Sequence, residues 1–201
     1  MIAVVLSEEY AKLDGAVTRR LSNPALIPKF QRVPWINSYI SDVSEAGLDH
    51  QRLLHRLHVY GLCEVKVSGD GNCQFRALSD QMYKSPEHHK YVRKEVIKQL
   101  KDNRSLYEGY VPMKYKHYYK KMAKSGVWGD HLTLQAAADK FVVKICLLTS
   151  FRDTCFIEIM PLNQAPWQEL WLSFWEIHYN SLYEIRDAPI QCKPRRKYWL
   201  F

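Results

Sequence analysis

The strongest constraint on the fold is a run of turn-forming residues that separates a strand-like segment from a helix-like segment. Residues 63–67 alternate apolar and polar side chains, which is the period-two pattern of a short strand. Residues 68–72 read SGDGN, and such a dense run of turn formers ends the strand. From residue 73 to residue 82, apolar side chains recur at spacings of three and four, which predicts an amphipathic helix. The sequence therefore places Cys73 at or beside a helix N-terminus.

This position suits a reactive cysteine. A helix N-terminus presents free backbone N–H groups, which lower the pKa of a thiol and can also stabilise a developing oxyanion. Gly69 and Gly71 permit backbone conformations that other residues avoid, while Asp70 and Asn72 can bond backbone amides through their side chains. Taken alone, a cysteine after such a turn is more often a small buried hydrophobic residue, so the motif leaves both interpretations open.

A candidate base lies far along the chain at His178. It follows the aromatic segment 171–175, which is predicted to be a strand, and Asn180 stands two positions later. If the strand continues, residues 178 and 180 share a face, so Asn180 can bond one imidazole nitrogen while the other faces a thiol. The plainer interpretation is a half-buried histidine at a strand end, with Asn180 as an ordinary turn residue. The long separation from Cys73 is neutral, because a nucleophile and its base are neighbours in space rather than in sequence.

Three sequence blocks together resemble one protein family. GDGNCQFRAL at 69–78, WGD at 128–130 and EIHYNSL at 176–182 resemble, in the same order, the motifs of the ovarian-tumour (OTU) family of cysteine proteases. The resemblance covers roughly residues 62–185 and is nearest to small OTU proteins of plants. It implies a papain-like α+β fold with a central sheet flanked by helices. It also implies a thiol-dependent deubiquitinase that hydrolyses (iso)peptide bonds at the C-terminal glycine of ubiquitin.

The resemblance also assigns roles to individual residues. It implies that Cys73 is the nucleophile and His178 the general base, and that Asn180 orients the histidine. Asp70 matches an aspartate that the family counts with the active site, although its physical role can equally be to shape the oxyanion loop. Trp128 is either a core aromatic or part of the wall of the substrate groove. We prefer the core interpretation, because large aromatics are mostly structural. The reaction requires no metal and no organic cofactor.

The order of predicted elements independently favours the α+β class, because helices come first and strands later. Residues 1–47 read as a leader that is partly extended or mobile, because three X-Pro pairs interrupt any regular pattern. An amphipathic helix over 48–61 leads into a catalytic domain over 62–185, and a basic tail spans 186–201. Within the domain we expect further helices over 88–101, 114–124 and 132–141, and strands over 142–149, 156–160 and 170–175.

Composition bounds the compartment and the partners. The five cysteines form an odd set without a CxxC pair, and no secretory signal precedes them, so we expect free thiols in the cytoplasm or nucleus. No apolar run approaches the ~18 residues of a membrane span, so no membrane partner is expected. The net charge is 29 − 21 = +8, which favours anionic partners. The resemblance implies ubiquitin, polyubiquitin chains and ubiquitinated proteins as partners of a protein expected to be monomeric.

Three other interpretations compete with this one. Segment 114–121 mixes lysines and tyrosines, a composition that suits nucleic-acid binding, although helical spacing favours a packed tyrosine stripe with a basic outer face. His55 and His58 share a helix face, but no cysteine pair stands near them at zinc spacing, so we expect no metal site. An inactive ubiquitin-binding OTU pseudoenzyme is the third interpretation, and the intact reactive positions count against it.

Overall fold

The computed structural model describes residues 45–187 and residue 189. The predictions for the leader up to residue 44 and for the basic tail from residue 190 onward lie outside the described residues. None of the described helices is both long and apolar enough to cross a lipid bilayer. The described residues from Ala46 onward belong to one compact unit.

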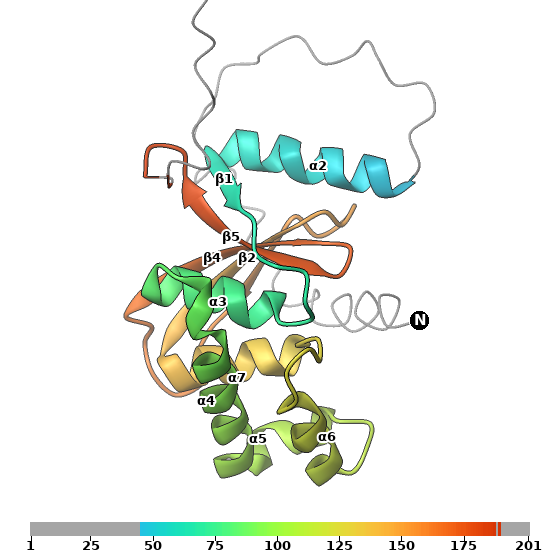
Figure 1. Cartoon of the computed structure of the whole chain (residues 1–201), viewed down its shortest axis with the longest axis vertical. Coiled ribbons are helices and arrows are strands. Elements are labelled where there is room, and N and C mark those ends of the chain that lie inside the picture. Colours follow the sequence, from blue (N-terminus) through green and yellow to red (C-terminus); the bar gives the residue numbers. More distant parts are fainter. Residues whose placement is uncertain (1–44, 188, 190–201) are drawn as a thin grey trace, which may run out of the picture. The chain divides into compact units, whose positions relative to one another are not determined.

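A five-stranded mixed sheet forms the centre of this unit. Its spatial order is β1-β5-β4-β2-β3 (Figure 1). The pair β2–β4 is parallel, and the other three neighbouring pairs are antiparallel. The strands are β1 (Leu62–Val65), β2 (Val143–Thr149), β3 (Phe156–Ile159), β4 (Gln168–Trp175) and β5 (His178–Glu184).

The hairpin between β4 and β5 differs from the expectation that one strand continues through residue 178. The strand β4 ends at Trp175, which pairs directly with His178 across a two-residue turn. The first turn residue, Glu176, has a φ of 53°, and positive φ values are what tight hairpin turns require. His178 and Asn180 still share a face, because both lie on β5.

Helices cover both faces of the sheet. The helix α3 packs against β5 and β4, α7 packs against β2, and α4 packs against α3 and α7 (Figure 1). The helices are α2 (Glu45–Tyr60), α3 (Cys73–Tyr83), α4 (His89–Asp102), α5 (Arg104–Tyr107), α6 (Tyr115–Met122) and α7 (His131–Phe141), with 3₁₀ turns η2 (Pro86–His88) and η3 (Glu108–Tyr110).

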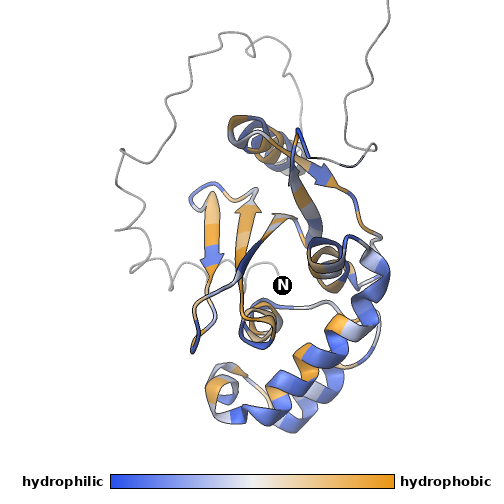
Figure 2. Ribbon diagram, turned by 90° about the vertical axis from the view of Figure 1, so that its left-hand side faces the viewer, coloured by the Kyte–Doolittle hydropathy of each residue, from blue (hydrophilic) through white to orange (hydrophobic). Residues whose placement is uncertain are grey.

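The opposite face of the sheet is covered by α2. Its Leu53 and Leu57 lie in a buried cluster with Leu62, Leu148 and Leu182, which come from three different strands. Figure 2 shows the central strands mostly in the hydrophobic colour and the outer helices mostly in the hydrophilic one. Burying these apolar faces between layers is the main stabilising contribution to the fold. The predicted α+β class, with a central sheet flanked by helices, is confirmed.

The predicted helices are present with ends shifted by a few residues, whereas the short elements α5, η2 and η3 were not predicted. Segments of three or four residues are too short to show the 3.6-residue periodicity on which the prediction rests. In α6 the tyrosines Tyr115 and Tyr118 are buried while Lys116 and Lys120 are exposed. This confirms the packed stripe with a basic outer face.

Candidate active site

Cys73 is the first residue of α3 and is buried, with 5% of its surface exposed. Burial raises the pKa of its thiol. A hydrogen bond with the His178 side chain and backbone hydrogen bonds from Tyr179 and Gln74 outweigh that effect, so the pKa lies below its ordinary value. The helix N-terminus predicted from the turn motif therefore holds a thiol whose surroundings favour the thiolate.

His178 is the first residue of β5 and is half-buried. Its hydrogen bond with Cys73 raises the pKa of the imidazole, burial opposes this, and hydrogen bonds to Asn180 and to the Val67 backbone add to the rise. Gly69 borders the ring, because a Cβ at that position would lie 3.8 Å from the Cε1 atom of His178. The two shifts run in opposite directions, so the pair favours a thiolate beside an imidazolium.

Asn180 lies behind the imidazole, as the i, i+2 spacing predicts. Its Oδ1 atom is 3.1 Å from His178 Nε2 and also accepts a 3.1 Å hydrogen bond from the backbone N–H of Val67. Its Nδ2 donates to Glu64 Oε1 at 3.3 Å. Because Nε2 is engaged with Asn180, Nδ1 is the ring nitrogen left to exchange a proton with a thiol.

Asp70 organises the turn before the nucleophile. Its carboxylate accepts the backbone N–H of Asn72 at 3.1 Å and pairs with Arg76, whose Nη2 lies 2.8 Å from Oδ2. The Arg76 guanidinium holds the pKa of this carboxyl well below its usual range. Arg76 also pairs with Glu87 at 3.3 Å, which fixes the direction of the guanidinium. These contacts favour the loop-shaping interpretation of Asp70 over direct participation in proton transfer.

Arg93 is a residue of the site that the sequence analysis did not single out. This α4 arginine is 4% exposed, and its guanidinium donates 2.8 Å hydrogen bonds to the Asn72 side-chain oxygen and to the carbonyls of Met122 and Val127. The guanidinium also lies over the Phe75 ring, 3.9 Å from its centroid. Its acceptors are neutral oxygens, and burial lowers its pKa to about 10, so it keeps its charge at neutral pH.

A second loop presses against the cysteine loop at Gly71. This glycine has a φ of 77°, and a Cβ there would lie 2.0 Å from the carbonyl oxygen of Gly126. Gly126 in turn donates its backbone N–H to the Asn72 side-chain oxygen at 3.0 Å. Glycine is therefore required at position 71 both for the backbone conformation and for the approach of the two loops.

The WGD block lies in this second loop and at the start of α7. Gly129 packs against Gln74, where a Cβ would come within 2.1 Å of the amide oxygen. Asp130 caps α7 in a capping box with Thr133. Trp128, however, is 49% exposed, so the interpretation as a core aromatic is wrong. The two residues that follow it, Gly129 and Asp130, make the inward contacts of the block, and the indole faces outward.

The signals that would have revealed the missed residues differ in strength. Arg93 stands four residues before Ile97 on the buried face of α4, so helical spacing alone places it among core positions. Glu64 alternates with apolar residues and thus reads as a solvent-facing strand residue, but it is only partly exposed and contacts Asn180. Its partner lies on a strand more than 100 positions away, and no local pattern reports that contact.

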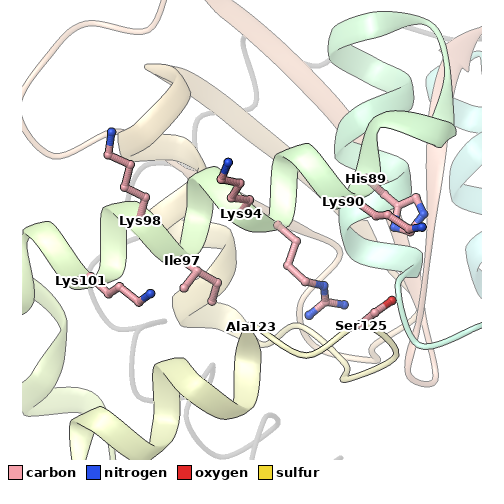
Figure 3. A pocket seen from close by; sticks show the side chains of 9 residues that line it. His89, Lys90, Lys94, Ile97, Lys98, Lys101, Ala123 and Ser125 are labelled. Atoms are coloured by element: carbon pink, nitrogen blue, oxygen red, sulfur yellow. The ribbon is translucent and has the colours of Figure 1, made fainter.

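The structure also bears on the rival sites. Among the described residues, no group of three or more His, Cys, Asp or Glu side chains could hold a metal ion. A pocket of ≈ 410 Å³ runs along α4 and is lined by Lys90, Lys94, Lys98 and Lys101 together with Arg93 (Figure 3). This pocket is lined by positive charge. It lies close to the cysteine loop, because Arg93 lines the pocket and also binds that loop at Asn72.

Comparisons with known sequences agree on one family. The sequence model described as "OTU-like cysteine protease" matches residues 68–183. Two similar relatives are from Arabidopsis thaliana and are named OVARIAN TUMOR DOMAIN-containing deubiquitinating enzymes 12 and 11. They are 73% and 55% identical to this chain, cover all of it, and are covered over 91% and 83% of their own lengths.

Solved structures show the same fold at low sequence identity. The OTU domain of OTUD1 superposes with a TM-score of 0.61 at 19% identity, over 70% of this chain and 99% of that one. An OTU domain solved in complex with ubiquitin gives a TM-score of 0.52 at 21% identity, over 60% of this chain and 69% of that one. At these identities the likeness concerns the fold alone.

Proposed function

This chain belongs to the OTU-like cysteine protease family and is a deubiquitinating enzyme of that family, and we propose that Cys73 is its nucleophile, His178 its general base and Asn180 the residue that orients the base. The observation that carries the assignment is the chain of contacts from the Cys73 thiol through His178 to the Asn180 amide. Its partners are ubiquitin and ubiquitinated proteins.

In the first half of the reaction the Cys73 thiolate attacks the carbonyl carbon of the ubiquitin C-terminal glycine. The carbonyl π electrons move to oxygen, and a tetrahedral intermediate forms. When it collapses, the C–N bond breaks and the substrate amine leaves with a proton from the His178 imidazolium. The products of this step are the free amine and a thioester between ubiquitin and Cys73.

In the second half a water molecule gives a proton to neutral His178 and attacks the thioester carbonyl. The C–S bond of the resulting tetrahedral intermediate breaks, ubiquitin leaves as a carboxylic acid that releases its proton to solvent, and the thiolate–imidazolium pair is restored. We assign the oxyanion to backbone N–H groups of the loop at 69–73 and the start of α3. The N–H of Asn72 is excluded from this role, because it already donates to the Asp70 carboxylate.

The direct test uses ubiquitin that carries a C-terminal electrophile, with the intact mass of the protein as readout. We expect wild type to gain the mass of one ubiquitin, Cys73→Ala to gain none, and His178→Ala to react slowly. Cys146→Ala is the matched control, since this second buried thiol has a pKa that burial raises to about 12. No adduct on folded wild type, or an adduct that persists in Cys73→Ala, would contradict the assignment.

Nucleic-acid binding has one specific observation in its favour, the lysine-lined pocket along α4. Of the three tyrosines of α6, Tyr115 and Tyr118 are packed inside and Tyr119 is partly exposed, so phosphate contacts would carry most of such binding. Binding to a single-stranded oligonucleotide that falls steeply with salt and survives Cys73→Ala would support this second function. Affinity unchanged by Lys94→Gln with Lys98→Gln would exclude the pocket as its site.

A further inference from the structure

Glu64 on β1 lies directly behind the proposed catalytic residues. Its Oε1 atom accepts a hydrogen bond from Asn180 Nδ2 at 3.3 Å and another from the Ser173 hydroxyl. The side chain is only partly exposed, and Asn180 is 8% exposed. Glu64 precedes the segment 68–183 that matches the family, and none of the three motif blocks contains it.

The chemistry of these partners fixes the orientation of the Asn180 amide. An ionised carboxylate only accepts hydrogen bonds, so Glu64 must face the NH₂ group of the amide. A backbone N–H only donates, so Val67 must face the amide oxygen. The two partners act from opposite sides, and both direct Oδ1 toward His178 Nε2.

This orientation decides which ring nitrogen of His178 carries the proton. An amide oxygen opposite Nε2 favours the tautomer with hydrogen on Nε2 and a lone pair on Nδ1. In that tautomer Nδ1 is the nitrogen that takes the thiol proton. A reversed amide would place an NH₂ group against Nε2 and favour the unproductive tautomer.

We propose that Glu64 is a positioning residue of the deubiquitinase reaction, which holds the Asn180 amide and thereby selects the His178 tautomer. The inference rests on the proposed role of His178 as general base. A charge-assisted hydrogen bond from Asn180 to Glu64 also polarises the amide and makes Oδ1 a stronger acceptor. The neutral Asn180 thereby becomes a stronger hydrogen-bond acceptor for His178 Nε2, which a charged aspartate at this position would be without help.

The first test compares Glu64→Met with Glu176→Met. Both substitutions remove one negative charge near His178, and methionine cannot accept the hydrogen bond from Asn180 that a glutamine oxygen would still accept. Glu176 is an exposed turn residue without the contact to Asn180. We expect Glu64→Met to lower kcat on a ubiquitin–peptide substrate about tenfold with KM unchanged, because outer contacts of a site typically act by orientation. We expect Glu176→Met to leave kcat within about twofold of wild type. Equal effects of the two variants would overturn the proposal.

A double substitution separates positioning from a purely structural role. Asn180→Asp places a carboxylate behind His178, so amide orientation no longer matters and Glu64 becomes a like-charged neighbour. Glu64→Met should then raise kcat when it is introduced into Asn180→Asp, whereas it lowers kcat when it is introduced into wild type. If Glu64 only stabilises the strands, the substitution lowers kcat in both backgrounds, and the proposal fails.

A spectroscopic test does not depend on activity. In ¹⁵N-histidine-labelled Cys73→Ala protein at pH 9, where the imidazole is neutral, we expect the His178 signals of the Nε2–H tautomer. Adding Glu64→Met should shift population toward the Nδ1–H tautomer, and an unchanged spectrum would contradict the inference. If wild type fails to react with the ubiquitin electrophile while the tautomer still responds to Glu64→Met, the proposed function fails and the positioning contact stands.

Discussion

The two halves of the active site are held in place by different means. The loop at 69–73, which presents Cys73, is held largely by side chains, with the ion pair Asp70–Arg76 on one side and buried Arg93 on the other. His178 and Asn180 are held by backbone pairing, since they lie opposite Trp175 and Ser173 in the β4–β5 ladder. The position of the nucleophile therefore depends on a few removable hydrogen bonds, whereas that of the base follows from the sheet.

This difference predicts that the cysteine loop is the more sensitive half to substitutions outside the reacting pair. A ladder distributes its hydrogen bonds over many backbone groups, so no single side chain controls it. A buried guanidinium that donates to several acceptors makes the position of the loop depend on one residue.

The largest effect is expected for Arg93→Met. Removing the guanidinium takes the Arg93 donor from the buried carbonyls of Met122 and Val127 and from the Asn72 side-chain oxygen, which keeps the Gly126 N–H. We expect this loss to lower the free energy of unfolding by about 3 kcal/mol. The loop would lose its fixed geometry, so we expect kcat on a ubiquitin–peptide substrate to fall by about 100-fold or more. Urea denaturation and steady-state kinetics measure the two effects.

Lys94→Met is the matched control for Arg93→Met, because it removes a neighbouring positive charge on the exposed side of α4. Arg93→Lys keeps the charge but lacks the planar fork, so it should recover stability only in part. If Arg93→Met is stable and as active as Lys94→Met, side-chain control of the loop is refuted.

The second prediction tests the histidine half with Asn180→Ala. His178 keeps its place on β5 but loses the acceptor opposite Nε2, so we expect kcat to fall by about 30-fold, less than in Cys73→Ala or His178→Ala. The substitution also removes the hydrogen-bond donor that Asn180 offers to the Glu64 carboxylate. Neutralising that carboxylate with Glu64→Gln in the same background should offset this part of the effect. Complete loss of activity in a folded Asn180→Ala protein would show that the ladder alone does not hold the base.

The third prediction concerns pH. The pKa of Cys73 is lowered and that of His178 is raised, so the thiolate–imidazolium pair forms below the ordinary thiol value of about 8.5 and persists above the ordinary imidazole value of about 6.5. In His178→Ala the thiol loses the hydrogen bond that lowers its pKa, and its alkylation midpoint should move to higher pH. At pH 7 we expect iodoacetamide to alkylate Cys73 about tenfold more slowly in His178→Ala than in wild type. Peptide mass spectrometry measures this rate. An unchanged midpoint would mean that the two side chains do not interact.

The smallest effect is expected for Asp70→Asn. The amide oxygen of asparagine can still accept the backbone N–H of Asn72, while the ion pair with Arg76 is lost. Because the Asp70 carboxylate lies at the surface, with 40% of its side chain exposed, we expect kcat to fall only about threefold. A loss comparable with that of His178→Ala would instead assign Asp70 to the chemistry, and Asp153→Asn on the exposed β2–β3 loop is the charge-matched control.

Local patterns were sufficient for the elements that position the nucleophile. The turn formers before Cys73 and the apolar spacing after it predicted the start of α3, because both signals lie within about ten residues. The pair His178 and Asn180 followed from strand periodicity in the same way, although the turn at Glu176 that starts β5 was missed.

What could not be predicted depends on contacts between distant segments. Arg93 reaches the loop at Asn72 from a different helix, and Glu64 reaches Asn180 from a different strand. Trp128 was assigned to the core because large aromatics are usually buried, but the close packing of Gly129 on Gln74 leaves it outside.

The sheet order has a consequence for how the enzyme comes into being. The strand that leads to the nucleophile, β1, is hydrogen-bonded to β5, the strand that begins with His178. Because β5 is synthesised more than 100 residues after β1, this pairing can form only once both strands have left the ribosome. A chain emerging from the ribosome thus carries Cys73 without its partner His178 until β5, the last of the described strands, has been made. Activation of the nucleophile therefore requires the completed sheet.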